Sequence, residues 1–153
     1  MSTSPLPSAG LFRRLASMVY DAFLLFAIAI AYGAFLLIVR VTFTDLETAT
    51  NNQLSPPLQW VAFAGLYLAM SSYFFVCWRT RGQTLGMKSW RLKLQQKNGD
   101  ILSWPQCWQR SLLAPLSLIC GGIGYLWCLI PPAKTCLHDI LTHTEVVVLP
   151  KKK

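Results

Sequence analysis

The chain has 153 residues and a formal net charge of +8, with 54% hydrophobic and only 13% charged residues. This composition is too apolar for an ordinary soluble domain of that length and favours a membrane protein. The basic residues lie beside apolar runs rather than on a separate polar domain, so the net charge does not indicate nucleic-acid binding.

The N-terminal residues 1–9 contain Ser, Thr and Pro and are expected to be a disordered lead-in. A helix is predicted from about Leu11 to Val39, and residues 22–39 within it contain no Asp, Glu, Lys or Arg. About 20 such residues cross the hydrocarbon layer of a bilayer as a helix. The sequence therefore predicts a first transmembrane helix here.

A polar face precedes this apolar run. Arg14, Ser17 and Asp21 follow one another at steps of three and four residues, which places them on one side of a helix. A carboxylate inside a membrane helix costs about 2.5–3.5 kcal/mol on insertion scales, so it indicates a partner or a function. Arg14 and Asp21 are therefore candidate site residues, and Ser17 is a secondary candidate.

Two further apolar runs, residues 58–78 and 111–133, also lack charged residues. The first is predicted to be a second transmembrane helix that packs antiparallel to the first through small residues, with Ala62, Gly65, Ala69 and Ser72 facing Ala27, Ala31 and Ala34. The run at residues 111–133 is predicted to be either a single span or a broken, re-entrant pair of short helices that turns near residues 121–124.

Short strands are predicted in the polar parts of the chain. Leu92 and Leu94 alternate with polar residues, and Asn98-Gly99 then precedes Ile101, a pattern typical of a β-hairpin. Residues 144–149 are a third strand candidate. We therefore expect an all-α membrane protein with a small cytoplasmic β patch.

Charge distribution predicts the orientation. The loop between the second and third apolar runs is strongly basic, which by the positive-inside rule places it and the N-terminus in the cytoplasm. A C-terminal strand that pairs with this loop must also be cytoplasmic, in agreement with the basic tail of residues 151–153. This placement favours the broken pair over a single third span.

The five cysteines form no CxxC motif and no Cys/His pair at zinc spacing, so they are expected to be reduced packing thiols. We expect no metal and no cofactor. Ser103 and Gln106 match a capping box at the start of the third apolar element, and residues 131–132, both Pro, are expected to end it.

Three blocks of sequence resemble one family. They are Arg14 to Asp21, Gly82-Gln83-Thr84-Leu85-Gly86-Met87-Lys88 with the following Trp90-Arg91-Leu92, and His138-Asp139 with Thr144. In this order and spacing the chain resembles the RDD family of small integral membrane proteins over residues 10–150, although His143 stands where relatives more often have Gly. The resemblance implies a multi-pass protein of the bacterial inner membrane with a role in transport; cation/proton exchange is proposed for some members. It implies no cofactor and no settled substrate.

With Asp139 added, the candidate ion or proton site consists of Arg14, Asp21 and Asp139. One interpretation is structural: Asp139 neutralises Arg14 or supports Asp21, and so locks the first helix to the C-terminal segment. The other is a cation or proton site, because a buried carboxylate without an opposing cation has a raised pKa. His138 is a secondary candidate that could shuttle protons near neutral pH.

Lys88 and Arg91 are expected to contact lipid headgroups. The sequence offers no nucleophile elbow and no carboxylate pair in a soluble pocket, so we do not expect an enzyme. The hypothesis is transport of a small cation or other solute, and the alternative is a non-transporting membrane scaffold or assembly partner. Because so few elements cannot easily enclose a solute path, we expect a homo-oligomer or a partner membrane protein.

Overall fold

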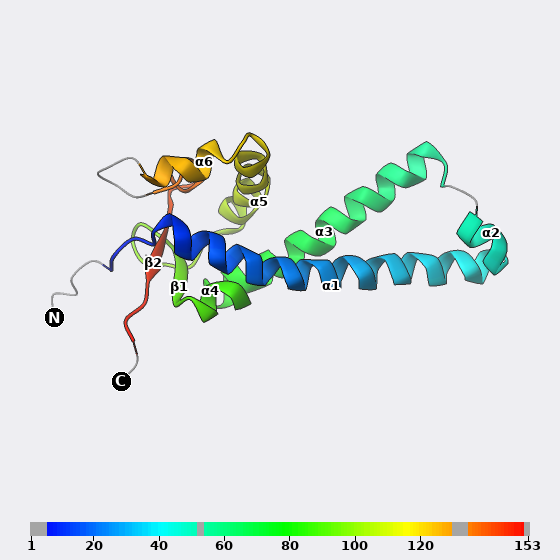
Figure 1. Ribbon diagram of the computed structural model, residues 1–153, viewed down its shortest axis with the longest axis horizontal. Coiled ribbons are helices and arrows are strands. Elements are labelled where there is room, and N and C mark those ends of the chain that lie inside the picture. The colour runs from blue at the N-terminus through cyan, green and yellow to red at the C-terminus, as the bar shows by residue number, and fades with distance from the viewer. Residues whose placement is uncertain (1–5, 52–53, 130–134, 152–153) are drawn as a thin grey trace. The chain divides into compact units, whose positions relative to one another are not determined.

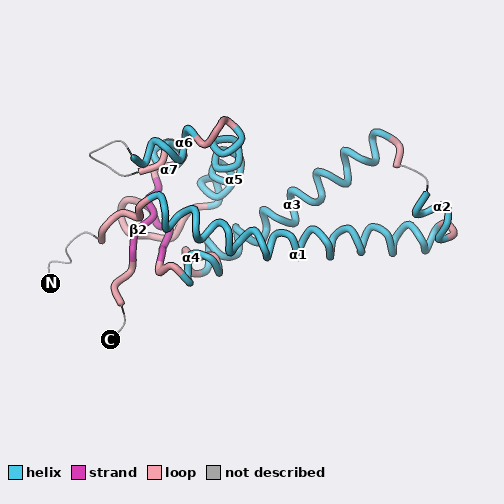
Figure 2. The backbone as a smooth tube through the Cα atoms, in the orientation of Figure 1, coloured by secondary structure: helices cyan, strands magenta, loops and turns pink. Residues whose placement is uncertain are grey.

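The computed structural model describes residues 6–51, 54–129 and 135–151 (Figure 1). The chain divides into two compact units. Unit 1 contains Met1–Asp21 and Phe74–Lys153, and unit 2 contains Ala22–Tyr73. Figure 2 shows that unit 2 is almost entirely helical, whereas both strands belong to unit 1.

Two helices are long and apolar enough to cross a membrane, α1 (Leu11–Phe43) and α3 (Pro56–Thr80). The short helix α2 (Leu46–Asn51) lies between them in sequence. Both predicted spans are confirmed in length and composition. Helix α1 extends four residues beyond the predicted end at Val39. In this last turn the Thr42 hydroxyl donates back to the carbonyl of Ile38 at 2.9 Å.

Within unit 2 the two long helices meet through a tyrosine. The Tyr32 hydroxyl donates to the Ala62 carbonyl at 3.1 Å, and the same hydroxyl fills the space where a Cβ on Gly65 would lie. The predicted line of small residues on α1 is wrong, because Ala27, Ala31 and Ala34 are exposed. The small residues of α3 instead make room for one large side chain of α1.

The third apolar run is a broken element. Helix α5 (Trp104–Ile119) is followed by α6 (Ile123–Leu126) and the 3-10 turn η1 (Trp127–Leu129), with a bend of 100°. Gly121 and Gly122 turn the chain with φ of 70° and 73°, which glycine adopts without steric penalty. The predicted broken pair is confirmed, and the expected stop at residues 131–132 lies outside the described residues.

Helix α5 begins as predicted with a capping box. The Ser103 backbone N–H donates to Gln106 Oε1 at 2.9 Å, and the Gln106 amide donates to the Thr142 carbonyl at 3.2 Å. The cap therefore also ties the start of α5 to the C-terminal segment.

The sheet of unit 1 consists of β1 (Leu92–Gln96) and β2 (Thr144–Val148), paired antiparallel with Leu94 opposite Val146. The strands predicted around Leu92 and Leu94 and at residues 144–149 are confirmed, and the second ends one residue earlier than predicted. The predicted hairpin is wrong: the turn at Asn98-Gly99 forms, but Leu102 adds no strand and is instead fully buried in the core. Its carbonyl accepts a hydrogen bond from Arg79 Nη1 at 2.7 Å.

The free side of β2 is covered by the N-terminal segment. Ser8 forms an isolated bridge with Val147, the Ala9 N–H donates to the Val146 carbonyl at 2.8 Å, and the Val148 N–H donates to the Pro7 carbonyl at 2.9 Å. Of the expected disordered lead-in, residues 7–9 are therefore ordered and Ala9 is fully buried, whereas residues 1–5 lie outside the described residues.

Unit 1 has a compact apolar core beneath the sheet. Two further short helices, α4 (Leu85–Ser89) and α7 (Leu137–Leu141), lie within this unit and carry the second and third sequence blocks. The core gathers residues from the N-terminal segment, α3, α4, β1, the start of the third apolar element and β2: Ala9, Phe75, Trp78, Met87, Leu92, Leu94, Leu102, Cys107 and Val146. This packing brings the polar residues of the candidate site together.

Candidate ion-pair and carboxylate site

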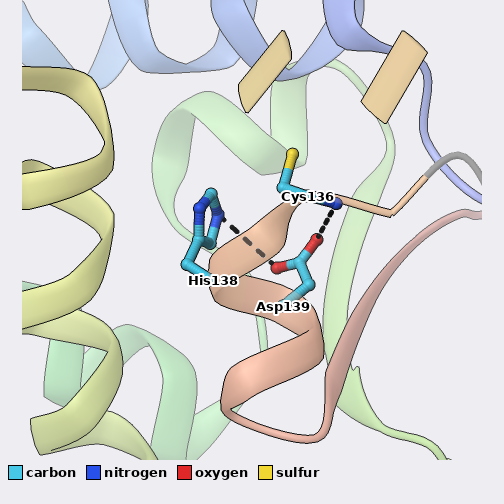
Figure 3. A group of neighbouring side chains, drawn as sticks. All are labelled: Cys136, His138 and Asp139. Carbon is cyan, nitrogen blue, oxygen red and sulfur yellow. Dashed lines mark hydrogen bonds and ion pairs between the residues drawn. The ribbon is translucent and has the colours of Figure 1, made fainter. Parts of the chain in front are cut away.

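Asp139 is fully buried in the first turn of α7. Cys136 is the N-cap of α7, and Asp139 Oδ2 accepts from the Cys136 backbone N–H at 3.4 Å, so the carboxylate caps its own helix (Figure 3). The second oxygen faces His138, whose Nε2 lies 3.6 Å away. The negative charge of Asp139 therefore lies in the interior of unit 1.

Two arginines face this carboxylate. Arg14 Nη1 of α1 lies 2.5 Å from Oδ2, and Arg110 Nη1 of α5 lies 2.6 Å from Oδ1. Both arginines are themselves buried, and each is oriented by a second oxygen: Arg14 Nε donates to the Ala9 carbonyl at 3.0 Å, and Arg110 Nη1 donates to Thr144 Oγ1 at 2.7 Å. The three charged groups form the Arg14–Asp139–Arg110 triad.

The two arginines of the triad keep Asp139 ionised. Burial by itself raises the pKa of Asp139, but the positive charges of Arg110 and then Arg14 outweigh it and lower the pKa to about 2. Asp139 is therefore ionised at neutral pH and does not exchange protons there. Of the two predicted partners, Asp139 binds Arg14, and the predicted link between the first helix and the C-terminal segment is present.

Asp21 lies two helical turns further along α1 and is held by the second sequence block. Thr84 Oγ1 donates to Asp21 Oδ2 at 2.5 Å, and the Gly86 N–H donates to Oδ1 at 2.9 Å. Thr84 is also the N-cap of α4, because its oxygen accepts from the Met87 N–H at 3.1 Å. Asp21 therefore extends the cap of α4 from a neighbouring helix.

The close approach of α4 to α1 requires glycine at position 86. A Cβ on Gly86 would overlap the backbone oxygen of Ser17 and lie 2.9 Å from the Asp21 carboxyl carbon. Ser17 itself donates its hydroxyl to the Arg14 carbonyl at 2.8 Å. The predicted secondary candidate Ser17 therefore belongs to the surface against which α4 packs.

His138 is buried with its ring 4.6 Å from that of Tyr125. Burial and the positive charge of Arg110 lower the pKa of His138 to about 4, although Asp139 opposes the shift. This lowered pKa disfavours a proton shuttle at His138 near neutral pH, a role that stays a hypothesis. A buried imidazole beside a guanidinium pair has a strong electrostatic reason to stay uncharged.

Cys136, His138 and Asp139 each offer one possible metal-ligand atom within 4.8 Å of the others (Figure 3). Each oxygen of Asp139 already faces a guanidinium, and burial raises the pKa of the Cys136 thiol to about 12. A divalent cation would have to compete with two fixed positive charges, so the geometry favours the ion pairs over a metal. Cys107, Cys128 and Cys136 are buried, as expected of packing thiols, whereas Cys120 is exposed.

Sequence reasoning missed Arg110, Thr84 and Gly86 as parts of the site. Arg110 is the one basic residue between Ser103 and Ala133, and this isolation within an apolar run was the available signal. Lys88 and Arg91 lie apart from the charged groups of the triad on the exposed surface of unit 1.

These features define a small membrane protein whose apolar helices are joined by buried arginine–aspartate contacts. The chain belongs to the RDD family, because the model of that family matches residues 8–143. A search of curated proteins gives no match. A search of solved structures also gives no match.

Proposed function

We propose that this RDD-family protein moves a small cation or other solute across the bacterial inner membrane, with Asp21 as the carboxylate that binds the cation or proton. The observation that carries the proposal is the setting of Asp21. It lies about 10 Å beyond Arg14 along α1, at the edge of the apolar run, and its oxygens accept from the Thr84 hydroxyl and the Gly86 N–H.

The two aspartates have different roles in this proposal. The pKa of Asp139 is held at about 2 by two arginines, which suits a permanent structural anion. Asp21 accepts from an uncharged hydroxyl and an uncharged amide, and a hydroxyl can turn to bond a protonated carboxyl or a bound cation. The Arg14–Asp139–Arg110 triad then keeps α1, α5 and α7 together while Asp21 changes partners.

The proposed orientation follows the positive-inside rule. A cytoplasmic α3–β1 region is supported by its exposed cations, Arg79, Arg81, Lys88, Arg91 and Lys97. Because β2 pairs with β1 and with residues 7–9, both chain ends share that side. Two long helices and a broken pair do not enclose a solute path alone, so the transporting form is a homo-oligomer or a complex with a partner membrane protein. Enzyme chemistry has no part in this proposal.

The test is ion-driven proton flux in proteoliposomes that contain the full chain and a pH-sensitive dye. Asp21→Asn should abolish flux driven by a sodium, lithium or potassium gradient, because the amide carries no exchangeable charge. Asp100→Asn, which removes an exposed carboxylate from the turn after β1, is the matched control and should leave flux unchanged. Equal flux from wild type and Asp21→Asn, with equal insertion, would overturn the proposal.

The alternative is a non-transporting membrane scaffold or assembly partner. It is favoured by one observation: Arg14, Asp21 and Asp139 all bond to other segments of the same chain and so stabilise the fold. This alternative predicts no ion-dependent flux from the wild-type protein under any gradient, together with a partner that co-purifies from the native membrane.

A further inference from the structure

Helix α4 lies along the first turns of α1 in unit 1. At its start, Gly86 contacts Ser17 and Asp21, as described above. Just beyond its end, the ring of Trp90 packs edge-on against Phe12, with centroids 5.8 Å apart and planes at 86°. The α4 segment therefore runs beside α1 from the level of Asp21 back to the level of Phe12.

This arrangement gives the α4 segment a direction relative to the bilayer. Asp21 lies nine residue steps after Phe12 on the α-helix, a rise of about 14 Å. The charge-free run of α1 begins after Asp21, so the Phe12 end is nearer to the headgroups. The C-terminal end of the α4 segment, with Lys88, Trp90 and Arg91, therefore lies closer to the membrane surface than its start.

The two faces of this segment differ in character. Gly86 and Met87 are buried, whereas Lys88 and Arg91 are exposed and the Leu85 side chain is 59% exposed. Phe12, beside Trp90, is 75% exposed. The outward face therefore presents apolar side chains next to cations and carries no acidic residue.

The backbone fixes Arg91 in this position. Its φ of 55° is in the left-handed region, and two hydrogen bonds hold it there: the Arg91 N–H donates to the Lys88 carbonyl at 3.1 Å, and the Leu149 N–H donates to the Arg91 carbonyl at 2.8 Å. The second bond ties the turn to the residue that follows β2. Arg91 is thus held by the fold beside Lys88 and not on a free loop.

We propose that Phe12, Leu85, Lys88, Trp90 and Arg91 form a binding surface for the headgroup of an anionic phospholipid, named here the α4 surface. Lys88 and Arg91 bind the lipid phosphate, while Leu85, Trp90 and Phe12 lie at the boundary between headgroups and acyl chains. Tryptophan and basic residues concentrate at this depth of the bilayer, and each surface cation adds to the attraction for anionic lipid. This proposal does not depend on the transport proposal.

The occupant is a lipid because apolar and cationic side chains share one face. Inorganic phosphate would use the two cations alone and leave the exposed Phe12 and Leu85 without a function. An acidic protein segment would be expected to meet the other exposed cations of unit 1 as readily. The lipid is the partner whose two chemical parts match the two parts of the α4 surface.

The experiment uses the full chain in nanodiscs of phosphatidylcholine with a minority of phosphatidylglycerol, each spin-labelled in turn. The preference for phosphatidylglycerol is measured by electron paramagnetic resonance. The test variant is Lys88→Gln with Arg91→Asn, because Asn tolerates a positive φ. The matched control is Lys97→Gln with Lys151→Gln, which removes the same charge from exposed positions outside the α4 surface.

The test variant should lose about fivefold or more of the phosphatidylglycerol preference, and the control variant should keep it. Quenching by brominated phosphatidylglycerol should fall in Trp90→Phe by more than in Trp60→Phe. Equal losses in the test and control variants would show a diffuse charge effect and overturn the proposal, as would full displacement of the labelled lipid by millimolar inorganic phosphate. Monodisperse elution and unchanged far-ultraviolet circular dichroism establish that each variant is folded.

Discussion

Arg14 and Asp139 are 125 residues apart in the sequence, and Arg14 Nη1 lies 2.5 Å from Asp139 Oδ2 in the interior of unit 1. Arg110 completes the contact from a third segment. Asp139 therefore joins α1, α5 and α7 at one point. Loss of this one carboxylate would leave two buried guanidinium groups without an anion.

Asp139→Asn should strongly destabilise the fold. The substitution leaves two buried arginines without their anion, and breaking a buried ion pair by removing one partner costs about 3–5 kcal/mol. The free energy of unfolding in mixed detergent micelles measures the effect. Asp100→Asn is the control and should unfold as the wild type does, since its carboxylate is exposed. A change of less than about 1 kcal/mol in Asp139→Asn would contradict a structural role for the triad.

The free energy of unfolding should decrease as the pH is lowered, because of His138. Its pKa is about 4 in the folded protein and 6.5 as the reference value, so the unfolded chain binds more protons between these values. The neutral His138 side chain contributes about 3 kcal/mol to the free energy of unfolding. This contribution is fully present above about pH 6.5 and is lost as the pH falls toward 4. Unfolding titrations near pH 7 and pH 5 should show this slope in the wild type. His138→Gln should flatten it, and an unchanged slope would contradict the assignment.

The fold was predictable where the signals are local. Arg14 and Asp21 stand out because charges at helical spacing enter an apolar run, and the glycines at 121–122 indicate the break in the third element. Asp139 was found through the resemblance, since an aspartate in a polar segment has no distinguishing mark of its own. Arg110 was missed because a cation next to a strongly basic loop is adequately explained by the positive-inside rule.

The pairing of the C-terminal strand with the basic loop was expected from the sequence and is present, but the chain after Asn98-Gly99 does not continue as the hairpin strand that was also expected. A β-hairpin is favoured by its turn sequence, and Asn98-Gly99 does form a turn after β1. The partner of Leu94 is nevertheless Val146, because burying Leu102 and Val146 in one core outweighs the local pairing preference. The contribution of Ser8 to the sheet was hidden by a polar, proline-containing segment that resembles a disordered one.

Gly86→Ala should displace α4 from α1. The added methyl group would meet the Ser17 backbone oxygen and the Asp21 carboxyl group, neither of which can yield without moving a helix. Overpacking of this kind costs about 1–3 kcal/mol. Gly33→Ala is the matched control, because nothing lies within 4 Å of the place that its Cβ would take and alanine favours a helix. If Gly86→Ala and Gly33→Ala have the same free energy of unfolding, the close approach of α4 to α1 is contradicted.

Thr84→Val should weaken the same contact without adding volume. Valine matches threonine in shape but cannot donate to Asp21 or accept from the Met87 N–H, so a buried carboxylate loses one donor and α4 loses its cap. We expect a loss of about 1–3 kcal/mol in the free energy of unfolding. Thr84→Ser retains the hydroxyl and should stay near the wild-type value. If valine is no more destabilising than serine, the hydroxyl adds nothing to stability, and the Thr84–Asp21 hydrogen bond is not what holds α4 against α1.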